Sequence, residues 1–150
     1  MIKKLLFASP LPALPKPADW AVGATLLAAR LWLANQFFFV GIDRVKDWDS
    51  QAFIFTDINP IPGIPGDVSA LAATAGEVTL PVLVALGLLT RIGAAGLFVM
   101  TAVIQFIVAQ TPQGMENFIG NSEHYTWMAV AAVIAVLGSG RFGIDRYLVK

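Results

Sequence analysis

Five polar side chains lie within otherwise apolar stretches of this chain, and their types indicate proton transfer and hydrogen bonding. Glu77 can take up and release a proton, and Arg30 can hold a carbonyl or anionic oxygen. Gln36, Gln105 and His124 add further hydrogen-bonding groups. A charged group deep in a bilayer is costly and is usually paired or faces a wet cavity. We therefore predict that Glu77 and Arg30 meet at the centre of the structure as a catalytic pair.

The segment that carries Glu77, residues 67–91, indicates the class of protein. More than twenty successive residues of it are apolar or small, and Glu77 is the one charge among them. A helix of about 20 such residues spans a bilayer core of about 30 Å. The whole chain of 150 residues is 57% hydrophobic and 13% charged, against about 25% charged in soluble domains. This composition predicts an all-α integral membrane protein.

The pattern of apolar segments predicts a four-transmembrane-helix bundle in a single domain. The bundle occupies residues 20–138, between an interfacial N-terminal tail, 1–19, and a C-terminal tail, 139–150. A long proline-rich outer loop joins the first two helices, and we expect it either to cap the bundle or to lie on the membrane surface. The four spans are expected at about 20–41, 68–90, 92–110 and 124–138.

The distribution of basic residues predicts the orientation. Lys and Arg gather in cytoplasmic flanks, and the residues on the side of both termini are Lys3, Lys4, Lys16, Arg91, Arg141, Arg146 and Lys150. The opposite flanks hold Arg44 and Lys46. The sequence therefore predicts a multi-pass protein of the bacterial inner membrane with both termini in the cytoplasm. Prolines interrupt the apolar run after Lys4, which favours a retained tail over a cleaved signal peptide.

The depths of the polar residues allow them to face one cavity on the outer side of the bundle. In that case Gln36, Gln105 and His124 would bind substrate, and Phe37 would line a slot for a flat ring. Each residue also has a structural alternative. The Arg30–Glu77 pair can serve to fix the register of two helices, the glutamines can bond across helices, and His124 can be a solvated or capping residue.

Composition excludes several kinds of site. The chain has no cysteine, which removes disulfides, thiol chemistry and Cys-ligated metal or iron–sulfur sites. Its single histidine cannot supply both axial ligands of a bis-histidine haem, and no metal-ligand spacing is present. A formal net charge of zero gives no reason to expect nucleic acid as a partner.

Three motifs make the chain resemble the DoxX family, in the wider group that includes quinone-linked DoxD proteins. They are the arginine-bearing first span ARLWLANQFFFVGIDRVKDW, the acid-bearing segment GEVTLPVLVALGLLTRIGAAGLFVM and the ending GSGRFGID. In that ending Ser139 and Gly143 depart from the expected Gly-Pro-Gly-Arg-aromatic-Ser-Leu-Asp. The resemblance implies a four-helix inner-membrane protein associated with redox systems, with Arg30, Glu77 and His124 as its site residues.

Three functions remain open at this stage. The first is a subunit or accessory of a quinone-dependent membrane oxidoreductase, with quinone as the one expected cofactor and a partner protein or small reductant as electron donor. The second is a non-catalytic anchor or assembly subunit for a partner protein. The third is a small proton-coupled transporter, which would require a homo-oligomer because the chain is short for alternating access.

Overall fold

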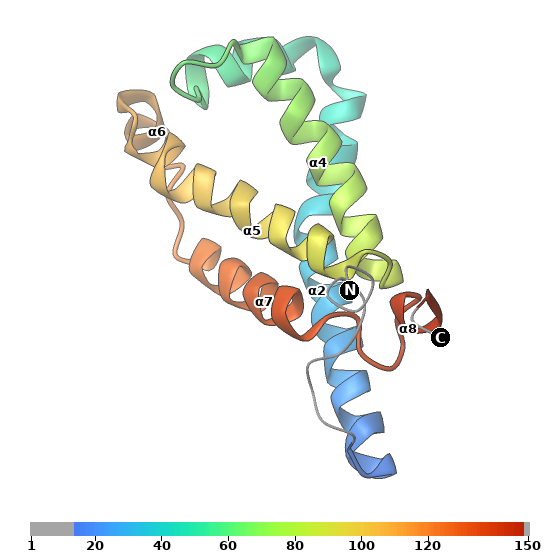
Figure 1. The fold of residues 1–150 in the computed structure, drawn as a ribbon. Helices are drawn as coiled ribbons and strands as arrows, with labels where there is room; N and C mark the ends of the chain where they lie inside the picture. The colour runs from blue at the N-terminus through green and yellow to red at the C-terminus, as the bar shows by residue number, and fades with distance from the viewer. Residues whose placement is uncertain (1–13, 149–150) are drawn as a thin grey trace.

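The computed structural model describes residues 14–148, and this part of the chain is helical without strands (Figure 1). Lys3, Lys4 and Lys150, used above for the orientation, lie outside the described residues, as does most of the predicted N-terminal tail. The long helices are α2 (Lys16–Lys46), α4 (Gly66–Leu86), α5 (Thr90–Phe106) and α7 (Glu123–Leu137). The short ones are η1 (Trp48–Ser50), α3 (Gln51–Phe53), η2 (Ile54–Ile58), η3 (Val108–Gln110), α6 (Pro112–Glu116) and α8 (Asp145–Leu148).

Three helical segments are long and apolar enough to cross a bilayer: Lys16–Lys46, Gly66–Leu86 and Thr90–Gln110. The last of these combines α5 with η3. Helix α7 is also apolar, but its 15 residues make it the shortest of the four. The predicted all-α membrane class is therefore confirmed, with three clear spanning helices.

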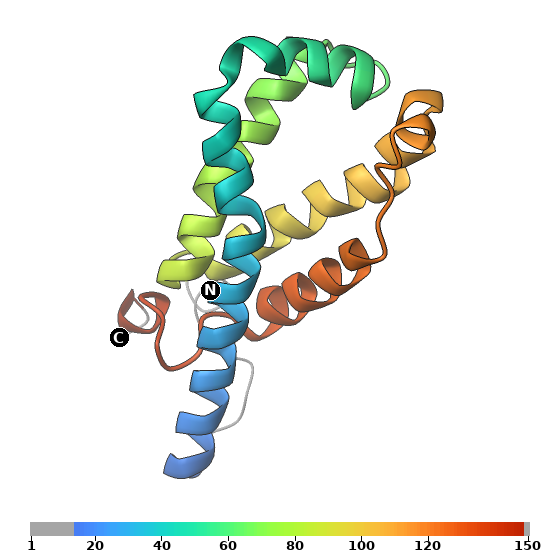
Figure 2. The same cartoon turned by 180° about the vertical axis from the view of Figure 1, so that it is seen from behind.

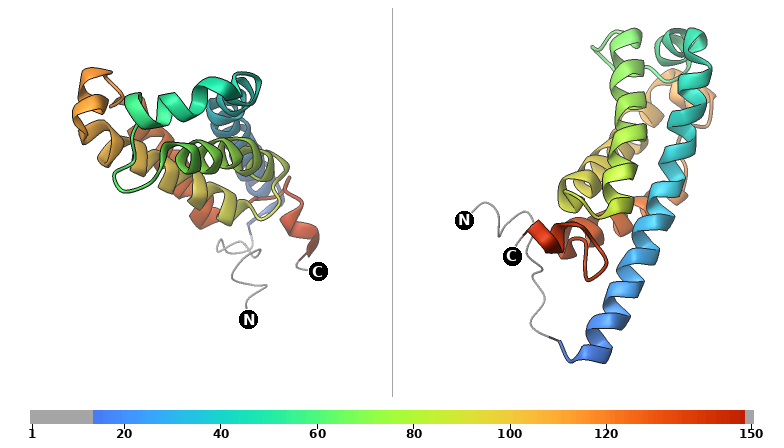
Figure 3. Two further views of the ribbon diagram at one scale, coloured as in Figure 1. Left: turned by 90° about the horizontal axis from the view of Figure 1, so that it is seen from above. Right: turned by 90° about the vertical axis from the view of Figure 1, so that its right-hand side faces the viewer.

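The long helices form two antiparallel pairs, α2 with α4 and α5 with α7 (Figures 1 and 2). The pairs meet at the turn 87–89 and diverge toward η2 and α6. Seen from the side, α2 and α4 run next to each other and the N-terminal part of α2 extends beyond the bundle (Figure 3). Buried apolar side chains from all four helices form the core where the pairs meet; they include Leu33, Phe37, Val84, Leu97 and Ile134.

Glycines permit the close helix contacts. A Cβ atom on Gly41 of α2 would lie 2.9 Å from the backbone carbonyl carbon of Glu77 on α4. A Cβ atom on Gly93 or Gly96 of α5 would meet Leu80 or its neighbours on α4 at 2.7–3.4 Å. The backbones of α2 and α5 can therefore approach α4 closely, as small residues allow in membrane bundles.

The segment between α2 and α4 is shorter and more helical than the predicted loop. Helix α2 continues to Lys46, five residues beyond the expected end, and η1, α3 and η2 extend helical structure to Ile58. The stretch 59–65 is free of helix and holds Pro60, Pro62 and Pro65, whose rings remove backbone donors. The expected span 68–90 begins at Gly66 and ends at Leu86, because Gly87 adopts a left-handed conformation with φ of 71°.

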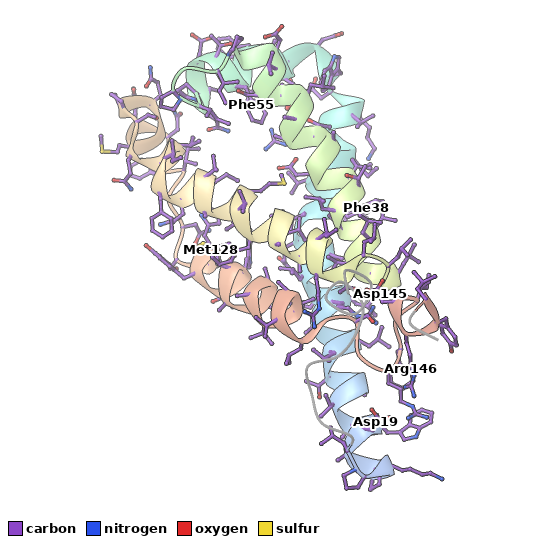
Figure 4. The ribbon with its side chains drawn as sticks, viewed as in Figure 1. Asp19, Phe38, Phe55, Met128, Asp145 and Arg146 are labelled. Atoms are coloured by element: carbon purple, nitrogen blue, oxygen red, sulfur yellow. The ribbon has the colours of Figure 1, made fainter. Side chains whose placement is uncertain are left out.

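The C-terminal segment packs into the turn between α4 and α5 instead of leaving the bundle. The carboxylate of Asp145 accepts hydrogen bonds from the backbone N–H groups of Leu89, at 2.7 Å, and Thr90, at 3.0 Å. The N–H of Asp145 donates to the carbonyl of Gly87 at 2.8 Å. Figure 4 shows Asp145 beside this turn, Arg146 after it in the C-terminal segment, and Asp19 on the N-terminal part of α2. Asp145 therefore caps the N-terminus of α5, where an acid is favourable.

Replacing Asp145 by alanine should destabilise the protein, because two N–H groups would lose their acceptor in a buried place. We expect Asp145→Ala to lower the free energy of unfolding by about 2–4 kcal/mol. Thermal unfolding of the parent protein and the variant in detergent measures this loss of stability. Asp43→Ala, which removes an exposed carboxylate paired with Lys46, is the matched control and should cost less than about 1 kcal/mol. Equal effects of the two substitutions would contradict the capping role.

Candidate functional site

Glu77 forms its ion pair with Arg44, and the predicted pair with Arg30 is wrong. The Nε atom of Arg44 lies 2.7 Å from Oε2 of Glu77. Glu77 is 4% exposed, at the middle of α4. Gly41 of α2 lies directly opposite Glu77 of α4. Arg44 lies about one helical turn beyond Gly41, toward η2. The Glu77–Arg44 pair thus lies on the half of α2 that adjoins η2. The sequence pattern had used Arg44 only as a flanking basic residue that helps to predict the membrane orientation.

Two side chains from the short helices after α2 hold Arg44 in place. Its Nη1 atom donates to Oε1 of Gln51 at 3.2 Å, and its guanidinium lies 4.8 Å from the ring centroid of Phe55. Gln51 is itself fixed, since its Nε2 atom donates to the carbonyl of Asp47 at 2.9 Å. The helical turn that replaces the expected loop therefore positions the cation of the pair.

The contact between Glu77 and Arg44 is short and buried. The Nε atom of Arg44 and Oε2 of Glu77 face each other at 2.7 Å, and neither of these two atoms has another partner. Charged side chains inside apolar helices are usually paired in this way and mark functional sites.

Arg30 is fully buried near the middle of α2 and has a different set of partners. Its Nη1 atom donates to the carbonyl of Val84 at 3.5 Å, and Nη2 donates to the carbonyl of Phe142 at 3.3 Å. The Asp145 carboxylate interacts with it electrostatically. Arg30 lies three helical turns before Gly41, about 16 Å along the axis of α2. It joins α2 to the end of α4 and to the C-terminal segment, and it is distant from Glu77.

A cavity of about 410 Å³ lies between the two helix pairs, where they diverge. That volume is within the range of about 300–1,000 Å³ typical of small-molecule sites. Most of its lining is apolar: Phe37, Val40, Phe55, Ile61, Ala72, Ala73, Val99, Met100, Val103, Ile104, Val108, Ile119 and Trp127. The rings of Phe37 and Trp127 meet edge to face at 5.4 Å. Phe37 thus lines the cavity, as predicted for a residue beside a flat ligand.

Six polar side chains also line this cavity: Gln36, Arg44, Asn59, Ser69, Glu77 and His124. Among them, Oδ1 of Asn59 and Oγ of Ser69 are buried without a hydrogen-bond partner. The amide of Gln36 donates to the carbonyl of Trp32 at 3.2 Å. Four predicted site residues, Glu77, Gln36, His124 and Phe37, are therefore brought to one cavity, whereas Arg30 and Gln105 are not part of its lining.

Gln105 lies behind His124 and binds it. Its Oε1 atom is 2.7 Å from Nδ1 of His124 and accepts a hydrogen bond from the backbone N–H of Asn121 at 3.1 Å. Its Nε2 atom donates to the hydroxyl of Tyr125 at 3.3 Å. The predicted binding role of Gln105 thus becomes a supporting contact, which links α5 to the start of α7.

Sequence reasoning missed Arg44, Ser69 and Asn59. One signal for Arg44 was available. It lies 14 residues after Arg30, four turns of helix, so both arginines occupy one face of α2 together with Phe37 and Gly41. Which arginine meets Glu77 depends on the antiparallel register, and the helical turns before α4 set that register.

The comparisons with known proteins identify the family. The sequence model of the DoxX family matches residues 25–110, more than half of the chain. The chain belongs to the DoxX family. The matched region includes α4, α5 and most of α2, and therefore both members of the Glu77–Arg44 pair. His124 and the Asp145 cap lie outside it.

A relative from Haemophilus influenzae, described as an uncharacterized protein, is 27% identical over 135 residues, which cover 85% of each chain. No solved structure matches the chain. The described residues contain no group of three His, Asp or Glu side chains that could hold a metal ion.

A double-mutant cycle should test the Glu77–Arg44 pair. Removing one charge leaves the other buried and unpaired, which costs roughly 3 kcal/mol. We expect Glu77→Leu to lower thermal stability in detergent by about that amount, and Arg44→Met in the same chain to restore much of it. Arg30→Met combined with Glu77→Leu should show no such rescue, because the residues are not in contact. Rescue by Arg30→Met would contradict the pairing described here.

Proposed function

We propose that this DoxX-family protein is a quinone-binding subunit of a membrane redox system, with its site in the cavity between the two helix pairs. The observation that carries the proposal is the Glu77–Arg44 pair, buried beside an apolar cavity in whose lining Oδ1 of Asn59 and Oγ of Ser69 have no hydrogen-bond partner. A quinone needs this combination, because its ring and tail are apolar and its two oxygens need polar partners.

The cavity offers a ring-binding slot next to the pair. Phe37 and Trp127 give edge-to-face aromatic contacts, and aromatic rings pack favourably against another flat ring. Gly41 holds α2 against α4 at the level of Glu77, so the acid is fixed relative to the slot. Membrane quinones dissolve in the bilayer, which is the environment of the apolar helices here.

The roles follow from the chemistry of the two side chains. Arg44 has only N–H donors and binds a carbonyl oxygen, while Glu77 can give or take a proton at that oxygen. Reducing a quinone to a hydroquinone consumes two electrons and two protons. We assign one proton to Glu77 and the second to solvent water. We assign the two electrons to a partner oxidoreductase or a small reductant, since the chain carries no cysteine for thiol redox chemistry.

A second candidate is an assembly subunit that anchors a partner protein. Beyond the end of α5, helix α6 exposes 59% of Met115, and the connection from α6 to α7 exposes 88% of Phe118. Exposed apolar side chains at one tip of a bundle are suited to contact with another protein. This role is compatible with quinone binding, because the electron donor must dock somewhere on the subunit.

We also propose that α7 is a fourth spanning helix and that both termini face the cytoplasm of a bacterial inner membrane. Arg91, Arg141 and Arg146 lie at the 87–89 turn or in the C-terminal segment bound to it, on one side of the bundle. This distribution follows the preference of basic flanks for the cytoplasm. At 15 residues, α7 is short, and a tilted or locally thinned bilayer is needed to accommodate it.

Quinone binding can be measured by quenching of tryptophan fluorescence with decylubiquinone in detergent, because Trp127 lines the cavity. We expect Glu77→Gln and Arg44→Met each to weaken binding about tenfold, the loss of one buried charged hydrogen bond. Asp43→Asn and Lys46→Met, which alter an exposed ion pair on the same helix, are matched controls and should bind as the parent protein does.

A variant that fills the cavity without touching its charges separates binding from stability. Ala73→Phe should also abolish quenching while the Glu77–Arg44 pair remains. Unchanged quinone affinity in Ala73→Phe, or equal losses in the Asp43 and Lys46 controls, would exclude this cavity as the site.

Topology can be tested by cysteine labelling, because the natural chain has no cysteine. In intact spheroplasts a membrane-impermeant maleimide should label Asp49→Cys and Ser122→Cys, and it should reach Pro17→Cys and Leu148→Cys only after lysis. Labelling of Leu148→Cys from outside would contradict the fourth span, and a fully reversed pattern would contradict the orientation.

A further inference from the structure

The hydrogen bonds behind His124 determine which of its ring nitrogens carries the proton. The Oε1 atom of Gln105 accepts from the backbone N–H of Asn121 at 3.1 Å, and an N–H can only donate. That contact identifies this atom of the Gln105 side chain as oxygen. The amide nitrogen of Gln105 then donates to the hydroxyl of Tyr125 at 3.3 Å.

The same oxygen lies 2.7 Å from Nδ1 of His124. Since the carbonyl oxygen of an amide has no hydrogen, Nδ1 must be the donor. A neutral imidazole carries one proton, so Nε2 is left as an acceptor. Gln105 therefore acts as a positioning residue that selects one of two tautomers of His124.

His124 lines the cavity and Gln105 does not. Because Nδ1 is turned to Gln105, Nε2 lies on the other side of the imidazole ring, and we infer that this edge of the ring faces the cavity. Trp127 packs its ring against the imidazole at 5.0 Å, which further restrains its rotation. No hydrogen bond of Nε2 occurs among the described residues.

We propose that His124 recognises the reduced form of the ligand. Its Nε2 atom would accept a hydrogen bond from a hydroxyl of a hydroquinone ring. The inference rests on the proposed quinone function and deepens it. Arg44, on the α2 side of the cavity, only donates and suits a carbonyl oxygen, whereas His124, on α7, presents an acceptor. An oxidised quinone has no hydrogen to give to Nε2. The α7 side of the cavity should therefore favour a hydroxylated ring over a carbonyl or an ether.

The tautomer is directly measurable, because His124 is the one histidine of the chain. The full-length protein, carrying an affinity tag without histidine, is labelled with ring-¹⁵N histidine and placed in nanodiscs at about pH 8, where an ordinary imidazole is neutral. We expect a protonated Nδ1 resonance and an unprotonated Nε2 resonance. Gln105→Met should lose this preference, and Tyr125→Phe, which leaves Oε1 of Gln105 in place, should keep it.

The ligand is tested with three probes that share the same ring substituents and decyl tail, namely decylubiquinol, its di-O-methyl ether and decylubiquinone. The quinol is kept reduced under anaerobic conditions with excess thiol reductant. We expect the quinol to shift the Nε2 resonance and to bind about tenfold more tightly than the ether, the effect of one buried hydrogen bond left unmade. His124→Gln, whose amide reaches the Nε2 position, should retain much of this preference. His124→Asn, whose amide imitates the Nδ1 side, should lose it while still binding Gln105.

The outcomes are distinguishable. A protonated Nε2 in the parent protein would overturn the inference whatever the ligand does. Quinone binding that depends on Glu77 and Arg44, with no difference between quinol and ether, would overturn it and leave the proposed function standing. Failure of all three probes to bind would overturn both, even with the expected tautomer.

Discussion

Two arginines on one face of α2 each need a partner where water is scarce, and the packing of α2 against α4 supplies different partners to each. Gly41 allows the backbones to approach at the level of Glu77, which brings the carboxylate to Arg44. Three turns away, Arg30 meets the end of α4 and donates to the carbonyl of Val84, which also accepts from the N–H of Gly87 at 3.2 Å. A single antiparallel register thus satisfies both cations, and a shift by one turn would leave one of them unpaired in an apolar interior, at a cost of several kcal/mol.

The two ends of the bundle consequently differ in character. At the turn between α4 and α5, the polar groups form hydrogen bonds with one another. Arg30 donates to the carbonyl of Phe142, and Asp145 caps α5. At the other end the helix pairs diverge, and the Glu77–Arg44 pair lies beside a cavity that Asn59 and Ser69 also line. The closed polar contacts and the cavity thus lie at opposite ends of the bundle. The fixed end holds the helix pairs together, which is what allows the other end to remain open enough for a ligand.

Both helix pairs contribute polar side chains to the cavity. Two of them, Arg44 and His124, are held in place by further contacts. Gln51 and Phe55 hold Arg44, while Gln105 and Trp127 hold His124. Supporting contacts of this kind fix the direction of each donor and acceptor, which is what distinguishes a preorganised site from a chance polar patch. The described structure therefore assigns roles to residues that differ from those of the sequence reading: Arg44 replaces Arg30 at Glu77, and Gln105 supports His124.

The sequence by itself determined the all-α class, the long apolar helices and several of the buried polar residues, Glu77 and His124 among them. Those features depend on composition and on runs of apolar residues, which are properties of single segments. Glu77 stood out because one acid in such a run is costly wherever the run packs. Only the tertiary structure decided that its partner is Arg44. The choice between arginines four turns apart depends on register, and register was set by helical turns in a segment expected to be a loop and by the contact at Gly41. The placement of Gln105 behind His124 likewise required the angle between α5 and α7, which no local pattern encodes.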